Sequence, residues 1–276
     1  MTSIHSPGDL SFLGKVYAGS QARLRSIVCT PFDYWSVTDI RKGRSDLGKP
    51  VPLDLFIWSN ARPVNPAVTR VGGVPYLPRA LEWPKRGGVV GEFYAQLNFM
   101  DSVDIVPRTP GGLLLVFKYY VEGLTSWHPN MYEFVWVDPE PEVKLWSADE
   151  IPQGGVGPEA ALHGYRFRDA DYPDLALTAP QACADGVHVL AATKVGGVPS
   201  DQQSIRPPIK PESWRFIGQV VATWPVEGVP YPVYDLPEPV RGGSAMFQAL
   251  VNGPGSGVLC LYLDDHDAVQ MHFSDG

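Results

Sequence analysis

A six-residue segment that occurs twice constrains the fold of this chain more than any other feature. Arg70-Val-Gly-Gly-Val-Pro75 returns as Lys194-Val-Gly-Gly-Val-Pro199, 124 positions later (194 − 70). Glycine reaches positive φ without a Cβ clash, while proline fixes its own φ and restricts the residue before it. Both copies are therefore predicted to follow the same turn, built by Gly72, Gly73, Pro75, Gly196, Gly197 and Pro199.

The residues that follow each copy correspond as well. Residues 92–99 alternate between polar and apolar side chains, the period of a half-buried strand. Residues 216–222 repeat this pattern at an offset of 123 (219 − 96), which places Gln219 at the position of Gln96. A glycine turn and an apolar run then follow in both copies. A period this long that occurs only twice favours two pseudo-symmetric halves over a solenoid.

Glycine and proline set the predicted fold class. The 276 residues include 28 of each, roughly twice the usual share, and they punctuate apolar segments. We predict an α+β, β-rich fold of mostly antiparallel sheets, with long Pro/Gly loops and short helices over residues 11–27, 158–162 and 180–184. The chain is predicted to form one domain over residues 1–276, with one half at about 1–150 and the other at about 151–276.

Charge and targeting signals limit the possible partners. The net charge of −8 argues against general nucleic-acid binding, which needs a basic surface, and suits a basic partner instead. No apolar run is long enough to cross a bilayer, and the first residues lack a signal-peptide pattern, so we predict a cytoplasmic protein that does not bind membranes. Cys29, Cys183 and Cys260 are odd in number and widely spaced, which disfavours disulfide scaffolds and zinc ribbons.

Candidate chemical motifs have simpler structural explanations. Asp264-Asp-His-Asp267 could ligate a metal, but adjacent strand residues point to opposite faces and no EF-hand pattern is present, so an acidic turn is favoured. Any Cys-His pair among three Cys and six His is expected by chance. The paired glycines lack the Lys-Ser/Thr ending of a P-loop. We therefore predict no catalytic residue, metal or cofactor, and no enzyme activity.

Two sets of polar residues remain as candidates. Gln96 and Gln219 are predicted to be buried amides that bind turn backbone, with contact to a ligand as the alternative. The acidic segments 138–142 and 168–174 read most simply as solvated loops, yet they would complement a basic partner. The predicted partner-binding residues are Glu140, Glu142, Asp169, Asp171, Tyr172 and Asp174.

The ordered set of motifs resembles the YwqG-like family of bacterial proteins. The resemblance covers roughly residues 67–263 and rests on Gly72-Gly-Val-Pro-Tyr-Leu-Pro78, Trp83-Pro84, Gln96-Leu-Asn-Phe99 and the second Gly-Gly-Val-Pro followed by Gln202-Gln203. It implies a mixed, β-rich fold with internal duplication and no established catalytic residues. Some relatives neighbour toxin genes and act as immunity proteins, and the chain resembles one that neutralises a type VI-secreted nuclease of the His-His motif class.

Two functional hypotheses follow. In the first, the protein is a cytoplasmic immunity protein that binds one-to-one to a cognate nuclease toxin and covers its active site or DNA-binding surface. In the second, it is a small-molecule binding module or enzyme with a pocket between the two halves. The acidic charge and the lack of a catalytic set favour the first hypothesis.

Overall fold

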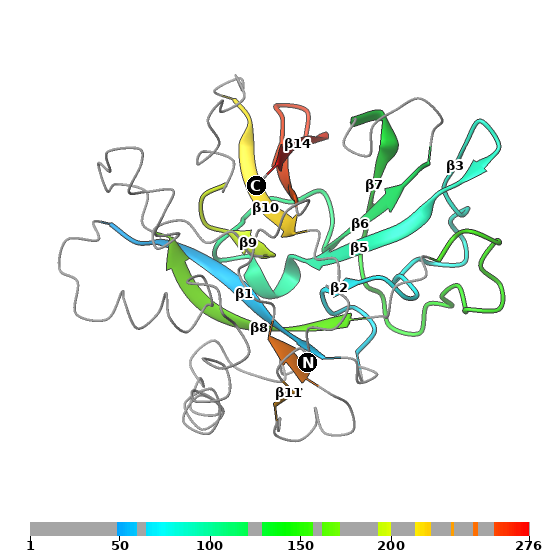
Figure 1. The fold of residues 1–276 in the computed structure, drawn as a ribbon, viewed down its shortest axis with the longest axis horizontal. Coiled ribbons are helices and arrows are strands. Elements are labelled where there is room, and N and C mark those ends of the chain that lie inside the picture. The colour runs from blue at the N-terminus through cyan, green and yellow to red at the C-terminus, as the bar shows by residue number, and fades with distance from the viewer. Residues whose placement is uncertain are drawn as a thin grey trace. The chain divides into compact units, whose positions relative to one another are not determined.

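The computed structural model describes residues 49–59, 65–120, 129–156, 162–171, 193–199, 213–221, 233–234, 245–247 and 257–275 (Figure 1). Over these ranges it consists of strands and two 3-10 turns, η1 (Met100–Ser102) and η2 (Pro129–Met131), with no α-helix. The predicted α+β class is therefore wrong, and the fold is β-rich with antiparallel strand pairs. The apolar run within Leu113–Lys118 is buried over its whole length and pairs with a strand on each side, as a short apolar segment bounded by turns favours.

The predicted short helices fall almost entirely outside the described residues. Residues 11–27, 158–161 and 180–184 lie outside the described ranges. Leu162, the last residue of the second predicted helix, begins strand β8 (Leu162–Asp171).

The chain divides into two compact units. Unit 1 comprises residues 1–57 and 166–276, and unit 2 comprises residues 58–165. Strands β1 (Val51–Ser59) and β8 each run across a boundary between the units. The division does not follow chain order, because β1 places residues 51–57 with the second copy of the repeat.

Unit 2 contains one antiparallel sheet and a small hairpin. The sheet order is β2-β5-β6-β7, and β2 also pairs with the first residues of β8. The strands are β2 (Arg70–Val71), β5 (Glu92–Asn98), β6 (Leu113–Lys118) and β7 (Tyr132–Val137). The separate hairpin joins β3 (Lys85–Arg86) to β4 (Val89–Val90).

Unit 1 repeats this arrangement. Its strand order is β14-β13-β10-β9-β1-β8, and β12 pairs with both β1 and β11. The strands are β9 (Lys194–Gly196), β10 (Arg215–Val221), β11 (Val233–Tyr234), β12 (Ala245–Phe247), β13 (Gly257–Leu263) and β14 (Val269–Asp275).

The strands around the two copies of the motif share the same register. Arg70 lies opposite Gln96 in unit 2, and Lys194 lies opposite Gln219 in unit 1. The register also shifts at the same place in both units, between Phe93 and Ala95 on β5 and between Phe216 and Gly218 on β10. Such a bulge bends a strand, so the two units share a local distortion as well as a strand order.

The motif glycines adopt the predicted backbone. Gly72 and Gly73 have φ of 66° and 72°, and Gly196 and Gly197 both have φ of 74°. The Gly197 turn is also crowded, because a Cβ there would lie 2.4 Å from the Asp171 Oδ2 atom and 2.9 Å from Leu53. Two glycines in the left-handed region thus build the same turn in each unit.

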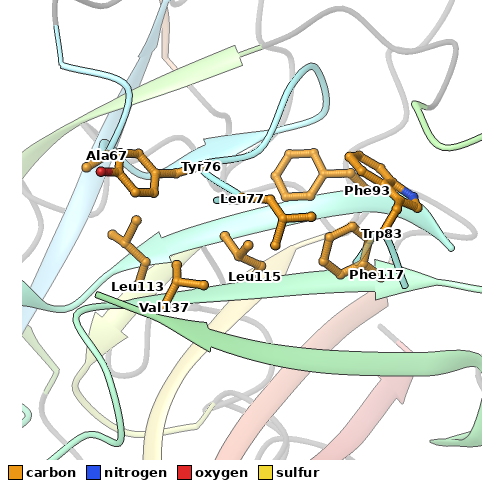
Figure 2. Packing of buried hydrophobic residues seen from close by; sticks show 9 residues of the cluster. All are labelled: Ala67, Tyr76, Leu77, Trp83, Phe93, Leu113, Leu115, Phe117 and Val137. Carbon is orange, nitrogen blue, oxygen red and sulfur yellow. The ribbon is translucent and has the colours of Figure 1, made fainter. Parts of the chain in front are cut away.

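The core of unit 2 lies where the chain after the first motif folds back onto the sheet. Figure 2 shows Tyr76 and Leu77 from this segment facing Leu113, Leu115 and Val137 from β6 and β7. The full cluster is Ala67, Tyr76, Leu77, Trp83, Phe93, Leu113, Leu115, Phe117 and Val137. The turn directs the following residues onto the sheet. The motif therefore places Tyr76 and Leu77 in the core of unit 2.

Replacing Gly197 by alanine should destabilise the protein more than replacing a left-handed glycine in open space. Gly88 has φ of +85° with nothing within 4 Å, so Gly88→Ala tests backbone strain alone. We expect Gly88→Ala to cost about 1–2 kcal/mol and Gly197→Ala about 3 kcal/mol or more, because the latter also displaces the buried Asp171 carboxylate. Urea unfolding measures both, and equal losses would contradict the crowding at Gly197.

Candidate partner-binding surface

The cation of the first motif holds its own turn. Arg70 is 6% exposed, and its two terminal nitrogens donate to the carbonyls of Val74 and Pro66, on either side of the glycines. No carboxylate pairs with Arg70 within the described part of the chain. Burial lowers the pKa of Arg70 to about 10, so the guanidinium stays charged at neutral pH.

Gln96, on the neighbouring strand β5, also hydrogen-bonds to the backbone around this turn. Its Oε1 accepts the Tyr76 N–H at 2.7 Å, and its Nε2 donates to the Val68 carbonyl at 2.7 Å and to the Pro66 carbonyl at 3.2 Å. The prediction that this buried amide binds turn backbone is confirmed. Gln219, its counterpart in unit 1, is also fully buried, and its Oε1 faces the Cys260 thiol at 3.8 Å.

A buried histidine lies opposite the first motif cation. His163 on β8 pairs with Arg70 across the strands and is 6% exposed. Burial, and then the charge of Arg70, lower the pKa of His163 from 6.5 to about 4. Its Nδ1 has no hydrogen-bond partner among the residues that the structure describes. His163 is therefore neutral at physiological pH.

Unit 1 neutralises its motif cation with a carboxylate. The Lys194 Nζ lies 2.6 Å from the Asp171 Oδ2 atom, and both side chains are fully buried. The same oxygen accepts the Val198 N–H at 2.8 Å. Asp171 was predicted to bind a partner from an acidic loop, but β8 continues through this residue and buries it, so it does not form part of an exposed surface.

A second buried carboxylate was missed by sequence reasoning. Asp54 on β1 is fully buried and accepts from Arg166 at 3.1 Å and from Arg168 at 2.7 Å. The available signal was an acidic residue at an apolar position of an alternating strand. These pairs give the buried Asp54 carboxylate cationic partners, which is the usual requirement for burying an ionised group and gives no evidence of catalysis.

The acidic turn between β13 and β14 also has a structural role. Asp264 accepts the N–H groups of His266 and Ala268, each at 2.9 Å, and the Gln270 side chain at 2.8 Å. These donors lower the pKa of the Asp264 carboxyl, led by the bond from Gln270. No cluster of metal-ligating side chains occurs among the residues that the structure describes.

Exposed carboxylates instead gather at one end of the unit 2 sheet. The Asp138 Oδ1 atom accepts the Gly112 N–H at 2.8 Å, which ties the loop after β7 to the turn before β6. A Cβ on Gly112 would lie 2.7 Å from the Met100 side chain and 3.1 Å from that of Pro139. Residues 100–112 and 138–142 are therefore neighbours, and we call them the acidic end of unit 2.

The acidic end combines negative charge with exposed apolar side chains. Its formal charge is −4 (1 − 5), because Arg108 is opposed by Asp101, Asp104, Asp138, Glu140 and Glu142. All six side chains are exposed, as are Met100 at 45% and Val103 at 63%. The loop is held by Tyr76, whose hydroxyl donates to the Glu140 carbonyl at 3.0 Å. Protein interfaces usually combine exposed apolar side chains with charged or polar groups around them. The acidic end has both kinds of group.

The structure places the predicted partner-binding residues in different regions of the protein. Glu140 and Glu142 lie on the acidic end, and Asp171 lies inside unit 1. Asp169 belongs to β8, while Tyr172 and Asp174 lie outside the described residues. Met100 and Val103 were missed because exposure of two apolar residues just after a strand leaves no periodic signal.

Comparison with known families shows a similarity over part of the chain. Residues 69–204 match the model of a family described as a domain of unknown function, DUF1963. The match begins directly before Arg70 and ends after the second Gly-Gly-Val-Pro segment, so it spans both copies of the motif. No curated protein matches the chain. Within the described residues, no helix has the length and apolar character needed to cross a membrane.

Breaking the Lys194–Asp171 pair should destabilise the fold. Lys194→Met leaves a buried carboxylate without its cation, and we expect a loss of about 3–5 kcal/mol. Adding Asp171→Asn removes that charge yet keeps an acceptor for the Val198 N–H, so the double variant should recover about 2 kcal/mol. Urea unfolding of both variants tests this, and a double variant less stable than Lys194→Met would contradict the assigned role.

Acid should weaken the fold through His163. Since its pKa is about 4 in the folded state against 6.5 ordinarily, the unfolded chain binds more protons between these values. The stability contributed by neutral His163 is therefore complete above pH 6.5 and is lost as the pH falls toward 4. His163→Leu should lose less stability than the unmodified protein over this range. Parallel losses in chemical denaturation would rule out His163 as the source.

Proposed function

We propose that this protein is a cytoplasmic immunity protein that binds and inhibits a secreted bacterial nuclease toxin. It acts by covering the toxin active site or DNA-binding surface and performs no chemistry of its own. The resemblance to the YwqG-like family motivates the choice of toxin. The DUF1963 domain at residues 69–204 supports only the coarser statement that the chain contains an uncharacterised domain.

The observation that carries the proposal is the contrast between buried and exposed charge. Asp54, Asp171 and Lys194 are fully buried and paired within unit 1, so they are not placed to meet a substrate. The carboxylates of the acidic end face solvent beside Met100 and Val103. A nuclease must present a basic surface to its DNA, and an acidic surface complements it.

Charge and apolar contact have separate tasks in such a complex. Complementary charge accelerates the encounter, whereas apolar contacts that exclude water govern how long the complex lasts. An inhibitor must outcompete DNA for the toxin, so we expect a one-to-one complex of nanomolar affinity or tighter, about −12 kcal/mol. The direct test is co-purification with the product of the adjacent gene, together with growth rescue when that product is expressed in the cytoplasm.

A second hypothesis, that the protein binds a small molecule, makes the opposite prediction. It expects tight binding of a metabolite and no effect on the toxicity of the neighbouring product. If that product is not toxic, or if this protein neither binds nor rescues, the immunity proposal fails.

Charge reversal at the acidic end should slow association with the toxin. We expect Glu140→Lys with Glu142→Lys to reduce the association rate about tenfold at low salt, and less at high salt because ions screen the attraction. Glu82→Lys with Asp265→Lys is the matched control, since it changes the charge equally at exposed sites outside the acidic end. Stopped-flow binding measures both. Equal slowing by the two pairs would show that only total charge matters.

Truncating the apolar part of the same surface should act on dissociation. Met100→Ala removes a side chain that is 45% exposed in the free protein, so it should barely affect folding. We expect the dissociation rate from the toxin to rise about tenfold while the association rate stays nearly constant. Val89→Ala, at a side chain with 41% exposure on the β3–β4 hairpin, is the control. An unchanged dissociation rate for Met100→Ala would remove this residue from the interface.

A further inference from the structure

Among the described residues, strand β7 forms one edge of the unit 2 sheet. Its register with β6 is unbroken from Leu113 opposite Val137 to Lys118 opposite Tyr132. No other strand in the described residues pairs with β7. An open strand edge presents a row of backbone donors and acceptors to any extended segment that approaches it.

The hydrogen-bond pattern identifies which backbone groups face outward. The Tyr119 N–H donates to the Met131 carbonyl at 2.7 Å, so this opposed pair is a bonded one. Antiparallel pairs alternate between bonded and non-bonded. Glu133, Val135 and Val137 therefore bond to β6, whereas Tyr132, Phe134 and Trp136 direct their N–H and C=O groups away from it.

One contact from another element agrees with this assignment. Arg86 on the β3–β4 hairpin donates to the outward carbonyl of Tyr132 at 3.3 Å. The same guanidinium lies 3.9 Å from the Glu133 carboxylate, which keeps the hairpin at the first residues of β7. The outward groups of Phe134 and Trp136 bond to no backbone or side-chain group in the described residues.

Beyond Glu133 and its contact with Arg86, β7 carries none of the features that usually protect an edge strand. Natural edges carry lysine, proline, a bulge or a very short strand, all of which discourage pairing. β7 runs for six residues, Tyr-Glu-Phe-Val-Trp-Val, with no lysine, proline or register shift. Aromatic and β-branched residues of this kind favour extended pairing. The edge is therefore suited to accept a strand.

We propose that β7 is a docking edge on which an extended strand of the basic toxin adds to the unit 2 sheet. The acidic end fixes the identity of the occupant, because residues 138–142 continue β7 directly and place Asp138, Glu140 and Glu142 beside the end of any added strand. Backbone bonds to Phe134 and Trp136 supply affinity, and the carboxylates select basic flanking residues. This inference rests on the proposed function and specifies how the partner binds.

Amide hydrogen exchange tests the docking edge at single residues. In the free protein, the Phe134 and Trp136 amides should exchange quickly, while those of Glu133 and Val135 are protected by β6. Adding the product of the adjacent gene should protect the Phe134 and Trp136 amides at least about tenfold. If a complex forms and both rates stay unchanged, the edge proposal is wrong although the proposed function stands. If no complex forms, both are wrong.

A proline variant tests the same edge by binding. Phe134→Pro deletes an outward N–H without removing a bond to β6, so the fold should tolerate it as edge strands do. We expect its affinity for the toxin to fall about tenfold or more, the effect of roughly one lost hydrogen bond. Phe134→Val keeps the N–H and should bind within about threefold of the unmodified protein. Equal affinities of the two variants would contradict strand addition.

A homodimer that protects the Phe134 and Trp136 amides without toxin would assign the edge to a second copy of this chain and overturn the proposal.

Discussion

A buried cation next to a left-handed glycine turn is the interaction on which each unit of this protein depends. Moving a charge out of water is costly unless the interior supplies compensating groups. Unit 2 supplies carbonyls, which match the flat donor fork of Arg70. Unit 1 supplies the Asp171 carboxylate, which matches the compact ammonium of Lys194. In both units the compensated charge fixes the turn, and the turn directs the following chain.

The different compensation explains how two copies of one motif diverge while their strand register stays the same. Arg70 and Lys194 occupy equivalent places opposite Gln96 and Gln219. Because Arg70 bonds to its own turn, unit 2 needs no carboxylate at this point. Lys194 depends on β8 to bring Asp171 to it. Residues near these cations are therefore constrained by charge balance as well as by packing.

Much of the fold could be predicted from local pattern, and the remainder depends on long-range contacts. The repeat and the period-2 segments predicted the strands around Gln96 and Gln219 and the left-handed glycines. The acidic run at 168–174 suggested a surface loop, since sequence does not reveal that a strand carries Asp171 to a lysine 23 positions away. The predicted helices lie almost wholly outside the described residues, and Leu162, at the end of one of them, begins strand β8.

The candidate site was also predicted only in part, because long-range contacts bring its segments together. Glu140 and Glu142 were identified from their charge, which sequence shows directly. Met100 joins them only because the turn at Gly112 brings two distant segments together. The open edge of β7 likewise depends on strand order, which a single strand pattern does not determine.

Paired charges lie inside unit 1 and exposed carboxylates lie at the acidic end of unit 2. Our central proposal is that the exposed charge binds a nuclease and blocks its access to DNA. Titrating the protein into a DNA-cleavage assay with the product of the adjacent gene tests this claim most directly. We expect a linear loss of cleavage that reaches zero at one molar equivalent, as for a tight complex. Full cleavage in the presence of excess protein would contradict it.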